Sequence, residues 1–278
     1  MIKNARENLT LSNRHQKFGM TDLSSLRGIL FDLDGVLYVG PNVIEGAINA
    51  ISDIKQRGYH CGFITNTSTL SSASLQKKLI GLGFEIAENE IISATRAARI
   101  YLQQFDDPVC HLLLSDDVKQ DFQHLSQSDS QADFVIIGDI GDAWSYKLIN
   151  NVFNLLINGA QLIAIHKNRF WQTEHGLQMD IGGFISALEY ASQKQSTIIG
   201  KPSPDFFQAA LTELDLPSEQ VAIIGDDIDS DIGGGQSAGL TGILVKTGKY
   251  RKAYADNSPI IPDLTIQSIA ELPGHLSS

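Results

Sequence analysis

Apolar runs that end in polar residues alternate along this chain with segments of helical periodicity. Residues 28–32 are apolar up to the aspartate that ends them, which predicts a buried strand. Residues 44–58 repeat isoleucine and alanine at helical spacing and finish at a glycine, which predicts a helix. A second strand is expected at 59–65, followed by a helix that opens on serines and threonines and ends at 81. This alternation is typical of parallel α/β proteins.

The alternation continues to residue 245. Runs at 170–173 and 177–179 predict a hairpin, and Gly182-Gly183 predict a break after it. Further strands are expected at 110–114, 134–138, 161–166, 196–199, 221–224 and 242–245. Further helices are expected at 96–105, 146–158, 184–192 and 205–214, and from 230 or 231. Together the elements predict a Rossmann-like parallel sheet covered by helices.

Polar side chains follow four of the predicted strands: Asp32, Thr65 with Asn66, Lys201, and Asp226 with Asp227. In open parallel sheets, ligands bind beyond the carboxyl ends of the strands. If these four strands are neighbours in one sheet, the four groups meet at one edge although they are far apart in sequence. Residues 95–180 contribute nothing to this set, which predicts that they form an inserted lid.

Composition and charge narrow the class of partner. Hydrophobic residues make up 42% of the 278 residues, enough for a core in one large domain or two moderate ones. The formal net charge of −11 argues against nucleic-acid and anionic-membrane partners, which need a basic surface. No apolar run is long enough to span a membrane. Cys61 and Cys110 lack metal or redox spacing, so we expect buried thiols in a reducing, cytoplasmic setting.

The carboxylates point to metal-assisted chemistry. An Asp-Gly pair such as Asp34-Gly35 is by itself typical of a simple turn. However, Asp226, Asp227 and Asp231 bring more negative charge to the same edge, which is costly unless a cation lies among them. Oxygen ligands without histidine or cysteine favour a hard ion, and phosphate chemistry favours Mg²⁺. A carboxylate nucleophile beside such an ion predicts phosphoryl transfer.

Other polar groups fit a phosphate but leave alternatives open. Lys201 offers a point charge for a phosphoryl oxygen, although Lys201-Pro202 also suits a plain helix entry. Thr65 and Asn66 lie at a predicted helix N-terminus, which favours anions. The glycines at 233–235 lack dinucleotide spacing and suggest close packing. His166, Lys167 and Arg169 either bind substrate or form a solvated strand end.

The ordered set Asp32-Leu-Asp-Gly-Val, Thr65-Asn66, Lys201-Pro202 and Gly225-Asp226-Asp227-x-x-x-Asp231 resembles the motifs of the haloacid dehalogenase (HAD) superfamily. The resemblance extends over about residues 26–250, and the insertion resembles the α/β C2 cap of subfamily IIA. It implies an α/β HAD core at 24–94 and 181–278 and a C2 cap at 95–180. Residues 1–23 have no counterpart and are expected to form an N-terminal arm.

The resemblance implies roles for the acidic residues. Asp32 would attack phosphorus and bind Mg²⁺. Asp34 would protonate the leaving group and later deprotonate water, while its main-chain carbonyl binds the metal. Asp226 would complete the metal site. Asp227 and Asp231 would hold these ligands in place without binding the metal themselves.

It also implies that Thr65, Asn66 and Lys201 hold the phosphoryl oxygens. Thr67 departs from the pattern, since many relatives have a second asparagine there. C2-capped relatives are often dimers, so the resemblance allows a homodimer but leaves the oligomeric state open.

The predicted function is an Mg²⁺-dependent phosphatase acting on a small phosphorylated metabolite through an aspartyl-phosphate. A neighbouring branch of the superfamily makes an inorganic pyrophosphatase or a phospholysine and phosphohistidine phosphatase the alternative. A catalytically idle phosphate-binding scaffold is less favoured, because no carboxylate of the set is missing. Carbon–halogen hydrolysis is disfavoured because it needs no acid at Asp34.

Overall fold

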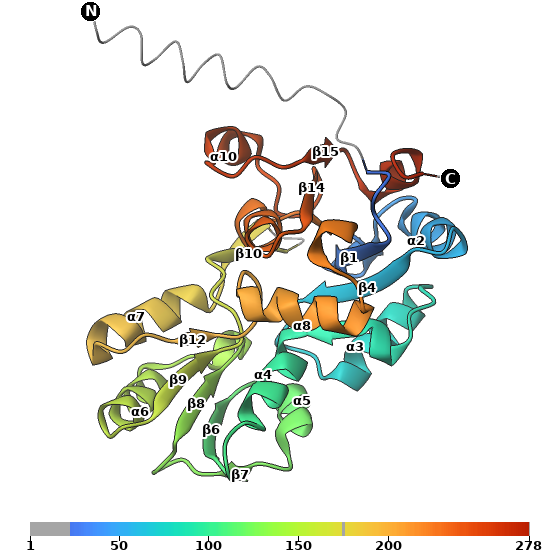
Figure 1. Cartoon of the computed structure of the whole chain (residues 1–278). Coiled ribbons are helices and arrows are strands. Elements are labelled where there is room, and N and C mark those ends of the chain that lie inside the picture. The colour runs from blue at the N-terminus through green and yellow to red at the C-terminus, as the bar shows by residue number, and fades with distance from the viewer. Residues whose placement is uncertain (1–22, 174–175, 278) are drawn as a thin grey trace, which may run out of the picture.

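The computed structural model describes residues 23–173 and 176–277, so the predicted arm at 1–23 lies outside it except for Leu23. The described residues form two parallel sheets with helices between and around them (Figure 1). This arrangement confirms the predicted α/β architecture. Within the described ranges, no helix is both long enough and apolar enough to cross a membrane.

The larger sheet, here called the core sheet, has the strand order β15-β14-β13-β1-β4-β5 and only parallel pairings. Side chains of its central strand alternate between two apolar layers: Ile29 and Phe31 pack into one and Leu30 into the other. Helices α2 (Ala47–Gln56) and α3 (Ser72–Gly81) cover the first layer. The strands are β1 Gly28–Asp32, β4 His60–Thr65, β5 Ile91–Ser93, β13 Val221–Gly225, β14 Thr241–Val245 and β15 Leu264–Ile266.

The smaller sheet, here called the cap sheet, has the order β12-β9-β8-β6-β7 and is also parallel. Helices α6 (Tyr146–Ile157) and α7 (Gly182–Ser192) pack on its outer face. Helices α4 (Ala94–Leu102) and α8 (Pro204–Leu214) lie between the two sheets (Figure 1). The strands are β6 Val109–Leu113, β7 Ser126–Gln127, β8 Phe134–Ile137, β9 Gln161–Ala164 and β12 Thr197–Ile198.

Shorter elements complete the described part of the chain. The predicted hairpin is confirmed as β10 (Phe170–Thr173) with β11 (Gly176–Met179). A second hairpin is formed by β2 (Tyr38–Val39) and β3 (Asn42–Val43). The remaining helices are α5 Asp116–Lys119, α9 Gly234–Ser237, α10 Lys252–Asn257, a π-helical segment Ile228–Gly233, and the 3-10 turns Glu88–Glu90, Gln120–Phe122, Gly141–Ala143, Ser218–Gln220 and Ile269–Gly274.

Two sequence-based expectations are wrong. The strand before Lys201 is not a neighbour of the core strands, because β12 pairs with β9 of the cap sheet. Gly182 and Gly183 do not break the chain but form the first turn of α7. A Cβ on Gly182 would lie 2.4 Å from the carbonyl oxygen of Asn168, so glycine lets this helix begin against the base of the hairpin.

Sheet membership also bears on the domain boundaries, which were expected at 24–94 and 181–278 for the core and 95–180 for the cap. Helix α7 packs against α6, and β12 pairs with β9, although both elements follow residue 180. We therefore propose that the chain returns to the core near residue 199 rather than 181.

Candidate active site

Asp32 and Lys201 form the centre of the site. Asp32 is the last residue of β1 and is 6% exposed, and Lys201 is 3% exposed. The Lys201 ammonium donates to Asp32 Oδ1 at 2.5 Å and to Asp231 Oδ1 at 2.6 Å. Burial works against the lysine charge, but the carboxylates of Asp231 and Asp32 raise the pKa of Lys201. The lysine therefore stays charged and offsets part of the negative charge buried here.

Three buried carboxylates lie close enough to share a cation. Asp32, Asp226 and Asp231 each offer an oxygen within 4.8 Å of the others. Both oxygens of Asp231 accept hydrogen bonds, from the Lys201 ammonium and, at 3.1 Å, from the N–H of Asp227. By contrast, Asp226 Oδ1 is buried and has no hydrogen-bond partner among the described residues. Burial and the neighbouring Asp32 raise the pKa of Asp226 well above its usual value.

An orphaned carboxylate oxygen in an all-oxygen donor set fits Mg²⁺. The other oxygen of Asp226 is enclosed by backbone. A Cβ on Gly35 or on Gly248 would lie 1.9 Å from Asp226 Oδ2, and both glycines have positive φ. The N–H of Lys249 donates to the same oxygen at 2.6 Å. Asp226 is therefore fixed through Oδ2, while Oδ1 is left without a partner.

Hydroxyl groups hold Asp34, the second carboxylate of the first motif. Its Oδ2 accepts from the hydroxyls of Tyr38 and Thr67, each at 3.1 Å. Thr67 Oγ1 in turn accepts from Thr65 Oγ1 at 2.9 Å. The departure noted at Thr67 therefore supplies a direct contact to the predicted acid, which sequence reasoning missed.

Asn66 binds the backbone of Lys201 through both polar atoms of its side chain. Its amide donates to the Lys201 carbonyl, and its oxygen accepts from the Lys201 N–H, both at 2.8 Å. A Cβ on Gly200 would lie 2.3 Å from Asn66 Oδ1, so the two loops are in close contact. The Asn66 side chain thus positions Lys201.

A cavity of about 320 Å³ joins these residues to the cap. The carboxyl ends of cap strands also reach it, because Asp139 follows β8 and His166 follows β9. Of the three basic positions singled out on this segment, only His166 lines this cavity. Lys167 is bound to Glu189 at 2.5 Å, and Arg169 reaches the core domain.

Comparison with known proteins decides the family. A family model described as haloacid dehalogenase-like hydrolase matches residues 29–126, and a HAD-hydrolase-like model matches residues 198–272. The haloacid dehalogenase-like hydrolase domain-containing protein 2 of Bos taurus is 38% identical over 258 residues, which cover 92% of this chain and 98% of that protein. This chain belongs to the haloacid dehalogenase-like hydrolases. The prediction from the four motifs is confirmed.

Other proteins similar to this HAD chain are named phosphatases. Phospholysine phosphohistidine inorganic pyrophosphate phosphatase of Xenopus laevis is 36% identical, over 89% of this chain and 93% of that protein. The structure of p-nitrophenyl phosphatase from Archaeoglobus fulgidus has a TM-score of 0.82 at 25% identity, with 90% and 98% covered. A 4-nitrophenylphosphatase from Thermotoga maritima shares the fold, with a TM-score of 0.84 at 24% identity and 91% and 98% covered. The HAD chain is therefore an enzyme of the phosphatase class.

Lys249 is a site residue that sequence reasoning missed. Its ammonium lies 3.5 Å from Asp227 Oδ2, and it lines the same cavity as Asp32. Burial works against its charge, but Asp227 and the other nearby carboxylates raise the pKa of Lys249. A weaker signal was present, because Lys249 lies in the loop after β14, four residues beyond the last strand residue Val245.

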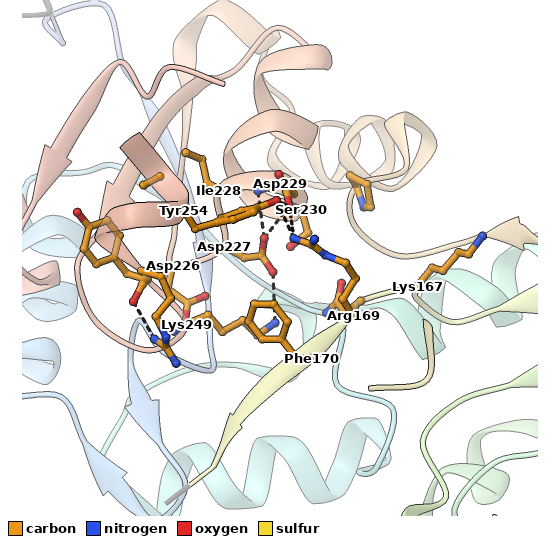
Figure 2. A pocket seen from close by; sticks show the side chains of 15 residues that line it. Lys167, Arg169, Phe170, Asp226, Asp227, Ile228, Asp229, Ser230, Lys249 and Tyr254 are labelled. Atoms are coloured by element: carbon orange, nitrogen blue, oxygen red, sulfur yellow. Dashed lines mark hydrogen bonds and ion pairs between the residues drawn. The ribbon is translucent and has the colours of Figure 1, made fainter. Parts of the chain in front are cut away.

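A second cavity of about 260 Å³ is lined by residues of the cap and of the core of this HAD enzyme and shares Lys249 with the first (Figure 2). Arg169 of the cap donates to Asp229 Oδ2 at 3.1 Å and to the Tyr254 hydroxyl at 2.6 Å. Tyr254 also donates to Asp229 at 2.6 Å. Asp229 lies between Asp226 and Asp231 in sequence, so this contact joins the cap to the loop that carries the carboxylates.

Proposed function

We propose that this chain is an Mg²⁺-dependent phosphatase that hydrolyses a small phosphorylated metabolite through an aspartyl-phosphate on Asp32. The observation that carries the proposal is the pairing of buried Asp32 with Lys201 beside the unpartnered oxygen of Asp226. Such a site supplies a nucleophile and a fixed positive charge in one cavity, with a place for a cation beside it.

The metal would be held by the side chains of Asp32 and Asp226 and by the main-chain carbonyl of Asp34. When bound, Mg²⁺ neutralises charge on the phosphoryl oxygens. Asp231 and Asp227 would support these ligands without binding the metal themselves. Asp231 orients Lys201, and Asp227 accepts hydrogen bonds from the N–H groups of Asp229 and Ser230 at 3.1 Å.

The covalent step forms a bond between an Asp32 oxygen and phosphorus while the bond from phosphorus to the leaving oxygen breaks. Asp34 gives its proton to that leaving oxygen, which departs as an alcohol. Water then attacks the aspartyl-phosphate, Asp34 takes a proton from it, and phosphate leaves with Asp32 regenerated. Lys201, the Thr65 hydroxyl and the Asn66 N–H would hold the phosphoryl oxygens during both steps.

The size of the cavity supports a small substrate. A cavity of about 320 Å³ accommodates a small leaving group beneath the cap. The relative named for phospholysine, phosphohistidine and pyrophosphate makes these P–N and P–O–P compounds the alternative substrates. The cytoplasmic location and the homodimer stay predictions.

The test is Asp32→Asn, which keeps the shape of the side chain but removes the attacking charge. With Mg²⁺ present, the wild-type enzyme should hydrolyse p-nitrophenyl phosphate. After acid quenching during turnover, intact-protein mass spectrometry should find one phosphoryl group on the enzyme. The variant should lose at least about 10³-fold in kcat and show no phosphoryl adduct. The matched control is Asp142→Asn, an exposed cap carboxylate. An active Asp32→Asn enzyme would remove Asp32 from the mechanism.

A further inference from the structure

Two cap residues in the active-site cavity have no part in the phosphoryl-transfer chemistry. His166 and Asp180 are 4% and 7% exposed, and both line the cavity that contains Asp32 and Asp34. Each side chain accepts one hydrogen bond from a backbone N–H, and the described residues give neither of them a further hydrogen-bond partner. Their position in the cavity suggests that a further partner is part of the substrate.

The backbone fixes both residues close to the phosphoryl site. The N–H of Gly200 donates to the carbonyl of Ile165 at 2.8 Å, so His166 begins beside the loop that carries Lys201. The N–H of Asp180 donates to the carbonyl of Arg169 at 3.1 Å, which closes the base of the β10–β11 hairpin. These bonds place Asp180 next to His166 on the cap side of the cavity.

His166 acts as a neutral hydrogen-bond donor. Its Nδ1 faces the N–H of Asn168 at 3.4 Å and therefore accepts, which leaves the ring proton on Nε2. Burial, together with the nearby Lys249, lowers the pKa of His166 to about 3, so the ring is uncharged at neutral pH. Nε2 lies 3.8 Å from Asp180 Oδ1, which is too far for a hydrogen bond between them.

Asp180 supplies the matching acceptor. Its Oδ1 accepts the N–H of Ile181 at 2.7 Å. Burial raises the pKa of Asp180 to about 6, so the carboxylate is mostly ionised at pH 7. A donor and an acceptor thus lie side by side without bonding to each other.

A hydroxyl group satisfies both side chains at once, because its oxygen accepts from Nε2–H and its proton goes to the carboxylate. An ammonium group has no lone pair for the histidine, and a second anion would be repelled by Asp180. We propose that His166 and Asp180 bind a hydroxyl group of the leaving group, so that the enzyme selects hydroxyl-bearing phosphate esters such as polyol phosphates. This inference rests on the proposed phosphatase function.

Three substrates with three-carbon leaving groups test the inference: glycerol 3-phosphate, n-propyl phosphate and 3-aminopropyl phosphate. The wild-type kcat/KM should favour glycerol 3-phosphate over n-propyl phosphate by about tenfold or more, since a site built for a hydroxyl rejects the analogue that lacks it. The aminopropyl ester should gain nothing over the propyl ester. p-Nitrophenyl phosphate, which has no aliphatic hydroxyl, reports the chemistry alone.

His166→Leu and Asp180→Ala should bring the glycerol-to-propyl ratio within about threefold of one and change p-nitrophenyl phosphate turnover less than about threefold. His166→Gln and Asp180→Asn retain a donor and an acceptor oxygen, so they should restore part of the ratio and serve where the larger changes prevent folding. Matched controls are the exposed residues His124→Leu and Asp142→Ala.

Three results would overturn the inference. The wild-type kcat/KM could be equal for the glycerol and propyl esters, or it could be highest for the aminopropyl ester. The variants could also lower kcat/KM for all substrates by the same factor. Failure of the proposed function looks different, because wild-type enzyme with Mg²⁺ would then leave even p-nitrophenyl phosphate intact.

Discussion

Lys201 donates to Asp32 at 2.5 Å although 169 residues separate them and their preceding strands belong to different sheets. Asp32 ends β1 in the middle of the core sheet, whereas Lys201 follows β12 at the edge of the cap sheet. The proposed nucleophile and its cation are therefore brought together by the packing of the two sheets and not by neighbouring strands of one sheet.

Removing the lysine charge should affect both folding and turnover. Lys201→Met leaves Asp32 and Asp231 buried without their cation, which typically costs about 3–5 kcal/mol of unfolding free energy. We expect a lower urea midpoint in chelator and a loss of phosphatase activity, with Lys252→Met, an exposed lysine, as control. A variant as stable as wild type would show that the carboxylates do not need Lys201.

Metal removal tests the orphaned oxygen of Asp226. EDTA should stop turnover, Mg²⁺ should restore it, and Ca²⁺ should bind yet support little activity because its coordination is looser. Mg²⁺ should also raise the thermal midpoint of the wild-type chain by mass action. Asp226→Asn should lose both effects. Full activity in chelator would leave the carboxylate cluster with another purpose.

Asp34 should matter most when the leaving group is poor. Asp34→Asn removes the proton donor, so alkyl phosphates should lose kcat/KM at least about tenfold more than p-nitrophenyl phosphate, whose leaving group barely needs a proton. Thr67→Val, which removes one hydroxyl contact to Asp34, should show the same trend more weakly. Equal losses for both substrates would contradict an acid role.

The contact from Arg169 to Asp229 and Tyr254 should assist substrate binding more than folding. Exposed ion pairs contribute about 0.2–1 kcal/mol, and Arg169 is 60% exposed. Arg169→Ala should raise KM about two- to fivefold with little change in kcat or thermal midpoint, and Tyr254→Phe should do the same to a lesser degree. Unchanged KM in both variants would mean that this contact does not help to hold the cap.

His166 and Asp180 should affect stability with opposite signs below pH 7. The His166 pKa is lowered to about 3, so the unfolded state binds more protons than the folded state below about pH 6.5. For this residue the unfolding free energy therefore decreases as the pH decreases. The Asp180 pKa is raised to about 6, so the folded state binds more protons there and unfolding free energy rises as pH falls.

Urea titrations at pH 7 and pH 5 separate the two terms. His166→Gln should lose about 1–2 kcal/mol less than wild type on acidification, and Asp180→Asn should lose about 1 kcal/mol more. Asp142→Asn should follow wild type. Parallel behaviour of all four proteins would mean that neither buried group titrates in this range.

The strands that carry Asp32, Thr65 and Asp226 could be predicted because each is a buried apolar run with polar residues at its carboxyl end. The sheet to which β12 belongs could not, because an apolar strand reads the same in either sheet and only two residues pair. The site roles of Tyr38 and Thr67 could not be predicted for another reason. Their role depends on a shared contact with Asp34 that no local pattern encodes.

The buried layer between the two sheets limits how the cap of this enzyme can be exchanged. Ile64 of the core sheet and Ile136 of the cap sheet belong to the same apolar cluster around α4 and α8. The cap is therefore not a detachable module, and a version of the core without it would expose part of that layer to water. If the cap of a relative were grafted onto this core, the side chains of α4 and α8 that face the cap would also have to be replaced by those of the relative.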